Sequence, residues 1–169
     1  MWGIKGRYKE KMNVGSRGDR GITAGGQTPS NSDVIDYVNI SSTGDAVDFG
    51  NLSAGRRNCK AATASPTRAV VGGGWISGNS DVGVNIMEYV TIGSTGNGTD
   101  FGDLVNGNRA YVGGGSNSIR GVCFGGDPAN THMEYITIAS AGDSTDFGDL
   151  SLARVAASGA SDSHGGLQA

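Results

Sequence analysis

The pentapeptide Asp-Phe-Gly-(Asp/Asn)-Leu occurs three times in this chain, at residues 48–52, 100–104 and 146–150. Each copy begins 11 residues after a tyrosine that follows an acidic residue. Self-similarity at a spacing of 46 to 52 residues is typical of propellers, solenoids and other arrays of one structural unit. The repeat therefore constrains the architecture of the protein more strongly than any single residue constrains its chemistry.

The aligned copies divide residues 20–169 into units near 20–67, 68–119 and 120–169, preceded by a basic arm at residues 1–19. Each unit opens with an arginine and a glycine pair, and a variable polar loop leads to the tyrosine segment. Alternation of tyrosine and β-branched residues predicts a strand with one buried face. A glycine turn, the Asp-Phe-Gly strand and a small-residue strand that begins with arginine complete the unit. The sequence thus predicts an all-β fold with four short strands per unit.

The order of these segments resembles the kelch repeat of β-propellers, with Phe49, Phe101 and Phe147 near the position that kelch repeats usually give to tryptophan. The turn and strand, Thr-Gly-(Asn/Asp)-x-x-Asp-Phe-Gly-(Asp/Asn)-Leu, are similar to kelch-like repeats in virion and fibre proteins of marine bacteriophages. The resemblance covers roughly residues 20–169. It implies a kelch-like, propeller-like array and a virion protein, although one fold serves many functions.

The length of the array raises the question of how it closes. Kelch-type rings generally have more than three blades, and terminal blades expose strand edges that invite pairing. The array begins at the glycine-pair strand and ends with a small-residue strand at residues 153–161. We expect this last strand to complete the leading blade, either of its own chain or of a neighbour, and two chains joined head to tail would give about six blades. A compact three-unit monomer and a β-solenoid are the alternatives.

The basic arm is the first candidate binding element. The first 20 residues hold six cations and two acids, whereas the remainder of the chain is acidic. Cations interleaved with apolar side chains suit an acidic, partly apolar protein surface, so we expect the arm to dock on other virion proteins. Nucleic acid is the less favoured partner, and a solvated tail is the functionless alternative. The residues of the arm that carry this prediction are Trp2, Lys5, Arg7, Tyr8, Lys9 and Lys11.

The variable loops are the second candidate. They differ between units while the framework does not, which is how a scaffold presents a recognition surface. A host surface glycan is the partner that they would bind, with Trp75 as the stacking residue. The residues chosen for this site are Trp75, Asn79, Asp127 and His132.

Residues that recur in every unit are expected to hold neighbouring units in a fixed arrangement. A catalytic group normally occurs once, so an arginine and an acid in each unit predict hydrogen bonds or ion pairs between blades. These residues are the arginines Arg56, Arg109 and Arg154, the acids Asp36, Glu88 and Glu134, and the motif aspartates Asp48, Asp100 and Asp146. The side chains of Asp45, Asn97 and Asp143 at the turns, together with the motif aspartates, could bind calcium. We expect them instead to cap backbone amides of their own turn, and we expect no metal site.

No nucleophile, base or metal-ligating cluster emerges from the sequence, so we expect neither an enzyme nor a cofactor. Cys59 and Cys123 are expected to be free, small buried thiols. Neither a signal peptide nor a membrane span is visible, which fits a virion component assembled in the host cytoplasm, and cytosolic repeat proteins fit as well. The sequence thus favours a phage virion structural protein, capsid-decorating or tail-associated and homo-oligomeric. A receptor-binding or glycan-binding adhesion module is the alternative.

Overall fold

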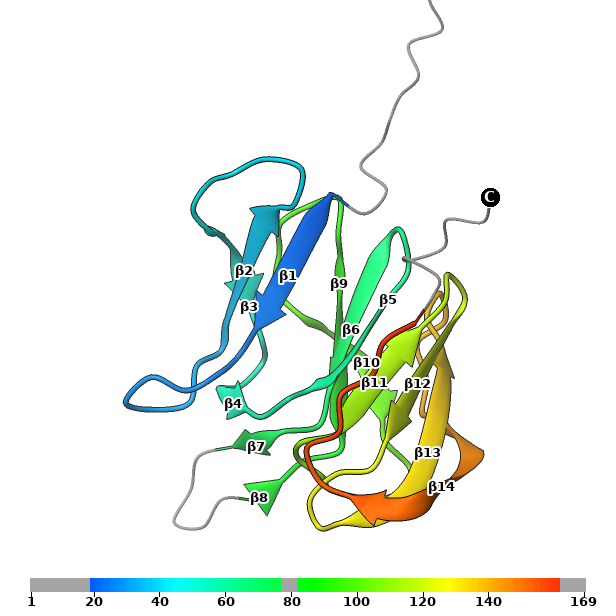
Figure 1. Ribbon diagram of the computed structural model, residues 1–169. Coiled ribbons are helices and arrows are strands. Elements are labelled where there is room, and N and C mark those ends of the chain that lie inside the picture. Colours follow the sequence, from blue (N-terminus) through cyan, green and yellow to red (C-terminus); the bar gives the residue numbers. More distant parts are fainter. Residues whose placement is uncertain (1–18, 77–81, 162–169) are drawn as a thin grey trace, which may run out of the picture.

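A computed structural model describes residues 19–76 and 82–161, and within them the protein is all-β, as the sequence predicts. Fourteen strands form four antiparallel sheets, and no helix occurs in these residues. Three larger sheets stand side by side, with the second between the first and the third (Figure 1).

The first sheet has the order β1-β2-β3. Its strands are β1 (Arg20–Ala24), β2 (Val34–Asn39) and β3 (Val47–Asn51). Because the residues of β2 alternate, Ile35 and Tyr37 face the second sheet, where Ile35 is buried and the Tyr37 ring packs edge-on against Phe49.

The second and third sheets repeat this order and add a fourth strand. The second is β5 (Ala61–Ala64), β6 (Arg68–Gly72), β9 (Ile86–Thr91) and β10 (Thr99–Asp103). The third is β11 (Gly113–Ser116), β12 (Arg120–Phe124), β13 (Asn130–Thr137) and β14 (Thr145–Arg154). The added strands β5 and β11 are the small-residue strands at the ends of the preceding sequence units, so the first and second units each contribute to two of the large sheets.

A fourth, small sheet was not anticipated. It consists of β4 (Arg56–Arg57), β7 (Trp75–Ile76) and β8 (Val82–Gly83) in the order β4-β7-β8. The prediction that Arg56 begins the small-residue strand is therefore wrong, because Arg56 pairs with Ile76 and the small-residue strand starts at Ala61.

The core lies in two layers, one between each pair of neighbouring large sheets. The repeated phenylalanines Phe49 and Phe101 are the central side chains, 2% and 1% exposed. Phe49 packs with Ile35, Leu52 and Val90 between the first and second sheets. The layer between the second and third sheets contains Ala61, Val70, Met87, Phe101, Leu104, Val112, Cys123, Ile136 and Ile138.

Within the described residues, no strand from the end of the chain pairs with the first sheet. The first sheet has no small-residue strand among the described residues, and β1 pairs only with β2 there. After β14, residues 157–161 form no strand and run beside β11 (Figure 1). Arg20 and Ile22 of β1 and residues 159–161 line the same cavity of about 290 Å³. Among the described residues, the end of the chain therefore adds no strand to the leading blade.

Candidate interaction surfaces

A buried ion pair joins the first unit to the second. Arg56, at the end of the first unit, pairs with Glu88 of β9, and the two side chains are 1% and 3% exposed. The Arg56 Nη1 also donates to the carbonyl oxygen of Ile86 at 3.0 Å, and Glu88 Oε1 accepts from the backbone N–H of Ser53 at 2.9 Å. Both charges are thus held by backbone groups as well as by each other.

The same arrangement joins the second unit to the third. Arg109 pairs with Glu134 of β13, and the two side chains are 2% and 0% exposed. The Arg109 Nη1 donates to the carbonyl oxygen of Gly125 at 3.1 Å. Glu134 accepts from the backbone N–H of Asn106 at 3.1 Å and from the Ser144 hydroxyl at 2.5 Å. In both pairs the arginine comes from one unit and the glutamate from the next, which is the ion pair between units that the sequence predicts.

The opening arginines of the units form a second set of contacts that the sequence did not reveal. Arg20 lies 4.5 Å from the centroid of the Tyr37 ring, and its Nη1 donates to the carbonyl oxygen of Ile92 in the next unit at 2.6 Å. In the second unit, the Arg68 guanidinium lies 4.1 Å from the centroid of the Tyr89 ring, and its Nη1 donates to the carbonyl oxygen of Ile138 at 3.0 Å. The available signal was that arginine and tyrosine recur at fixed positions of two strands that pair, which permits a cation–π contact.

The turns after the tyrosine strands contact the preceding unit. The Asn97 side-chain oxygen accepts from the backbone N–H of Asn51 at 3.0 Å, and Asp143 accepts from that of Asp103 at 2.9 Å. These side chains do cap backbone amides, but the amides belong to the neighbouring unit and not to the turn itself. The motif aspartates are exposed, and their side chains make no hydrogen bond or ion pair within the described residues: Asp48, Asp100 and Asp146.

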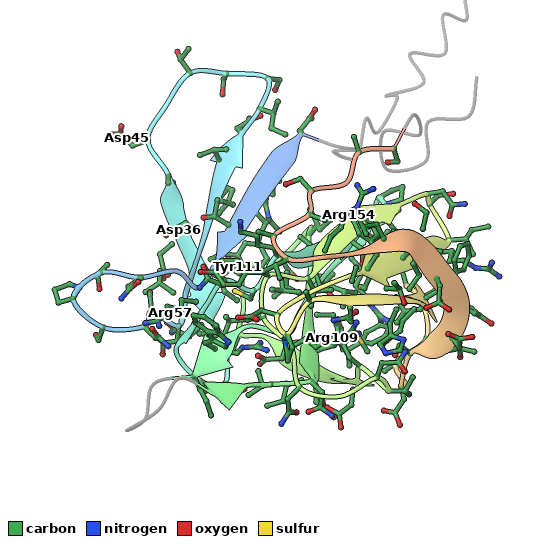
Figure 2. The ribbon with its side chains drawn as sticks, turned by 60° about the horizontal axis from the view of Figure 1, so that its bottom comes forward. Asp36, Asp45, Arg57, Arg109, Tyr111 and Arg154 are labelled. Atoms are coloured by element: carbon green, nitrogen blue, oxygen red, sulfur yellow. The ribbon has the colours of Figure 1, made fainter. Side chains whose placement is uncertain are left out.

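The equivalent residues at the two ends of the array are unpaired. Arg154 is exposed and Asp36 is half-buried, and in the described part of the chain neither side chain has a hydrogen-bonding or ionic partner. Figure 2 shows Asp36 beside the first sheet and Arg154 on β14, well apart. An ordering role for Arg154 therefore finds no partner within the described chain.

The residues predicted to form a ligand site do not gather into one. Trp75 is half-buried, packs edge-on against Tyr111 at 5.3 Å, and carries the Arg57 guanidinium over its ring at 5.1 Å. His132 is exposed and its Nδ1 lies 3.8 Å from Asp149. Asp127 pairs through its backbone with Ala110, and Asn79 lies outside the described residues, as do all six residues chosen in the basic arm. No contact among the described residues joins Trp75 to His132.

Both cysteines are free thiols, as expected. Burial raises the pKa of Cys123 to about 12, and the nearby Glu134 charge acts in the same direction. Cys59 is half-buried and not buried as predicted. Its pKa is also raised by burial, against the lowering effect of the Arg56 charge. A raised thiol pKa disfavours the nucleophilic thiolate.

The described residues contain no cluster of three or more His, Cys, Asp or Glu side chains placed to hold a metal ion. Nor do they include any helix that could cross a membrane.

Comparison with known proteins identifies a similar fold and no family. No protein-family model and no curated protein matches the chain. Among solved structures it is similar to a novel fungal alcohol oxidase with catalytic diversity among the AA5 family, in complex with copper, at 12% sequence identity and a TM-score of 0.53. The match covers 73% of this chain and 29% of the oxidase. At this identity the similarity shows a shared fold only.

Proposed function

We propose that this protein is a non-enzymatic structural component of a bacteriophage virion, capsid-decorating or tail-associated, built as a kelch-like propeller array that oligomerisation completes. Its basic arm, residues 1–19, docks on neighbouring virion proteins. The observation that carries the proposal is the use of the recurring charged residues. Buried charged side chains are the groups best suited to catalysis, but here they form ion pairs between units. These pairs are Arg56–Glu88 and Arg109–Glu134.

The propeller part of the proposal is supported by the regular step from sheet to sheet. The same ion pair, the same arginine-to-carbonyl bond and the same turn contact join the first unit to the second and the second to the third. Residues of β1, β5 and β11 line one cavity, which favours an arrangement around an axis over a linear solenoid.

We propose no enzymatic role and no cofactor. The oxidase with a similar fold is an alcohol oxidase in complex with copper, but that activity and that metal belong to a protein of which the match covers 29%. Activity in this chain would require a site built from groups that do not recur, whereas the recurring pairs Arg56–Glu88 and Arg109–Glu134 are used in contacts between units.

Deletion of residues 1–19 tests the docking role of the arm. The full chain and the truncated chain are each supplied during infection by the phage that encodes the protein, and purified particles are probed for both. We expect the truncated chain to fold and to be absent from the particles. A matched variant with the arm cations Lys5, Arg7, Lys9 and Lys11 changed to glutamine separates the contribution of charge from that of the apolar side chains. Incorporation of the truncated chain at the level of the full chain would overturn the proposal.

Glycan recognition by the variable loops is the alternative, and the same proteins test it. A glycan array probed with the truncated chain, with Trp75→Ala as the control, would give a tryptophan-dependent signal if the loops are the functional surface. The contacts of Trp75 with Arg57 and Tyr111 favour a structural role for this side chain, so we expect no such signal.

A further inference from the structure

We propose that the two outer faces of the array bind each other between two copies of this chain, through the contacts that join units within one chain. The first-sheet face consists of Asp36, Val38, Ile40 and the turn at Asp45. The third-sheet face consists of Arg154, Phe147 and Gly148. This inference builds on the proposed completion of the array by oligomerisation and is independent of the virion role.

The charged residues of the two faces complete the series of ion pairs. Asp36 lies opposite Asp48 in the ladder of β2 and β3, and Glu88 lies opposite Asp100 in the ladder of β9 and β10, so Asp36 has the place of the buried glutamate. On the other face, the backbone carbonyl of Arg154 accepts from Gly126 N–H at 3.0 Å. The carbonyls of Arg56 and Arg109 accept from Gly26 and Gly74 in the same way, at 2.8 and 2.9 Å. Arg154 of one copy is therefore placed to pair with Asp36 of another.

The apolar residues show the same difference between internal and outer positions. Phe49 and Phe101 are 2% and 1% exposed, whereas the equivalent Phe147 is 47% exposed. Ile40 is 66% exposed, whereas the equivalent Ile138 is fully buried against the preceding unit. Val38 is 37% exposed, and its equivalents Val90 and Ile136 are 6% and 3% exposed. Because Asp36, Val38 and Ile40 alternate along β2 and its end, they share one side of the sheet.

The shape of the third-sheet face also matches the turn of the first sheet. A Cβ atom on Gly50 or Gly102 would lie 2.4 Å from a backbone atom of the next unit's turn, at Gly96 or Gly142. At the equivalent Gly148 the nearest atom that such a Cβ would meet is the Met133 methyl at 4.0 Å, so this position has room for the same turn. The turn at Asp45 is the equivalent of those at Asn97 and Asp143, and among the described residues no unit lies on its side of the first sheet for it to cap.

A second copy of the chain is the partner that these faces fit. The first-sheet face carries an acid and a turn, and the third-sheet face carries an arginine and room for that turn. In the described part of the chain the first sheet also has no small-residue strand, and residues 157–161 lie beside β11 much as β11 lies beside β5. They are thus in the position from which the next sheet would receive that strand. A head-to-tail contact made twice closes around a dyad, so two chains bring six large sheets into one ring.

The mass of the protein in solution tests this inference. Analytical ultracentrifugation of the full chain should give twice the monomer mass of 17.1 kDa. Asp36→Ala and Arg154→Ala should each weaken association at least about 30-fold, because each leaves a buried charge unpaired. The double variant should lose less than the product of the two single losses, since it leaves neither charge alone.

The control is Asp48→Ala, which also removes an acid from the first sheet. Asp100, its equivalent, stays exposed although the second unit is flanked on both sides, so we expect Asp48→Ala to associate like the wild type. Circular dichroism of the dissociated variants should be unchanged, because neither Asp36 nor Arg154 has a side-chain partner in the described chain. A wild type that remains a single chain at every concentration, or single variants that associate normally, would overturn the inference. Truncation of residues 1–19 should leave the oligomeric state unchanged. A result against the docking role of the arm is therefore distinguishable from a result against this contact.

Discussion

Replacing Arg109 by alanine should destabilise the protein severely. The side chain is 2% exposed and forms an ion pair with Glu134, which is fully buried. Its removal leaves the Glu134 carboxylate between the second and third sheets without a counter-charge. The bonds from the Asn106 N–H and the Ser144 hydroxyl remain, but neither carries a full positive charge. The variant also loses the hydrogen bond from Arg109 to the carbonyl oxygen of Gly125.

The size of the effect follows from the burial of both partners. Breaking a buried pair by removing one member costs about 3–5 kcal/mol. Native domains have a free energy of unfolding on the order of 5–15 kcal/mol, so the variant loses a large fraction of the total. For a chain of this size the loss corresponds to a decrease in Tm of about 6–20 °C. Because the pair lies between two units of an array, the third unit should unfold first in this variant.

The assay is urea denaturation followed by circular dichroism and by tyrosine fluorescence, for the wild type and three variants. Arg109→Ala should show the full loss of unfolding free energy. Its unfolding transitions measured by circular dichroism and by fluorescence should no longer coincide, because the third unit unfolds separately. Combining Arg109→Met with Glu134→Leu should recover much of the loss, because it leaves no buried charge. Asp100→Ala removes an exposed charge of the same unit and should stay within about 0.5 kcal/mol of the wild type. An Arg109→Ala protein as stable as Asp100→Ala would show that the buried pair does not hold the units together.

Three further predictions follow from burial and backbone geometry. Phe101→Ala should lower the free energy of unfolding by about 3–5 kcal/mol, whereas Phe147→Ala should lower it by about 1 kcal/mol or less in the dissociated chain. Chemical denaturation measures both losses, and equal losses would contradict the assignment of Phe147 to the outer face. Because burial keeps the Cys123 thiol neutral with a pKa raised to about 12, its contribution to stability is intact below pH 9.0 and is lost as the pH rises towards 12. The unfolding free energy of Cys123→Ala should fall less over this range, and parallel pH profiles would contradict the prediction. Ala156 has a φ of 56°, a conformation that costs a non-glycine residue about 1–2 kcal/mol. Ala156→Gly should therefore raise the free energy of unfolding by about 1 kcal/mol or less in denaturation experiments. A decrease would be inconsistent with strain at this position.

The regular part of the fold was predictable because its signals are local and occur three times. Alternation around each tyrosine places strands at β2, β9 and β13, and the Asp-Phe-Gly motif places strands at β3, β10 and β14. The expectation of ion pairs between units was also accessible, since a charged residue that recurs in every copy needs a recurring partner.

Other features depend on contacts that a single pass along the sequence does not contain. Strands of two residues, such as β7 and β8, are too short to show a period, so Trp75 at the start of β7 was predicted to lie in a variable loop. The ion-pair partners are 32 and 25 residues apart, and the assignment of each arginine to the following unit rests on how the sheets stack. The capping residues Asn97 and Asp143 were assigned to their own turn because only local partners are visible in a sequence.

The charged contacts give direction to an array whose sheets are otherwise nearly alike. Apolar layers built from Phe49 and Phe101 would tolerate several relative orientations, since dispersion and burial are not directional. An arginine on one side of each unit and an acid on the other permits only head-to-tail stacking, because any other orientation opposes like charges in a dry layer. The same rule applies to the outer faces. Two first-sheet faces would oppose Asp36 to Asp36, and two third-sheet faces would oppose Arg154 to Arg154. The self-association proposed above would thereby take the form of the heterologous contact, in which each copy contributes one face of each kind.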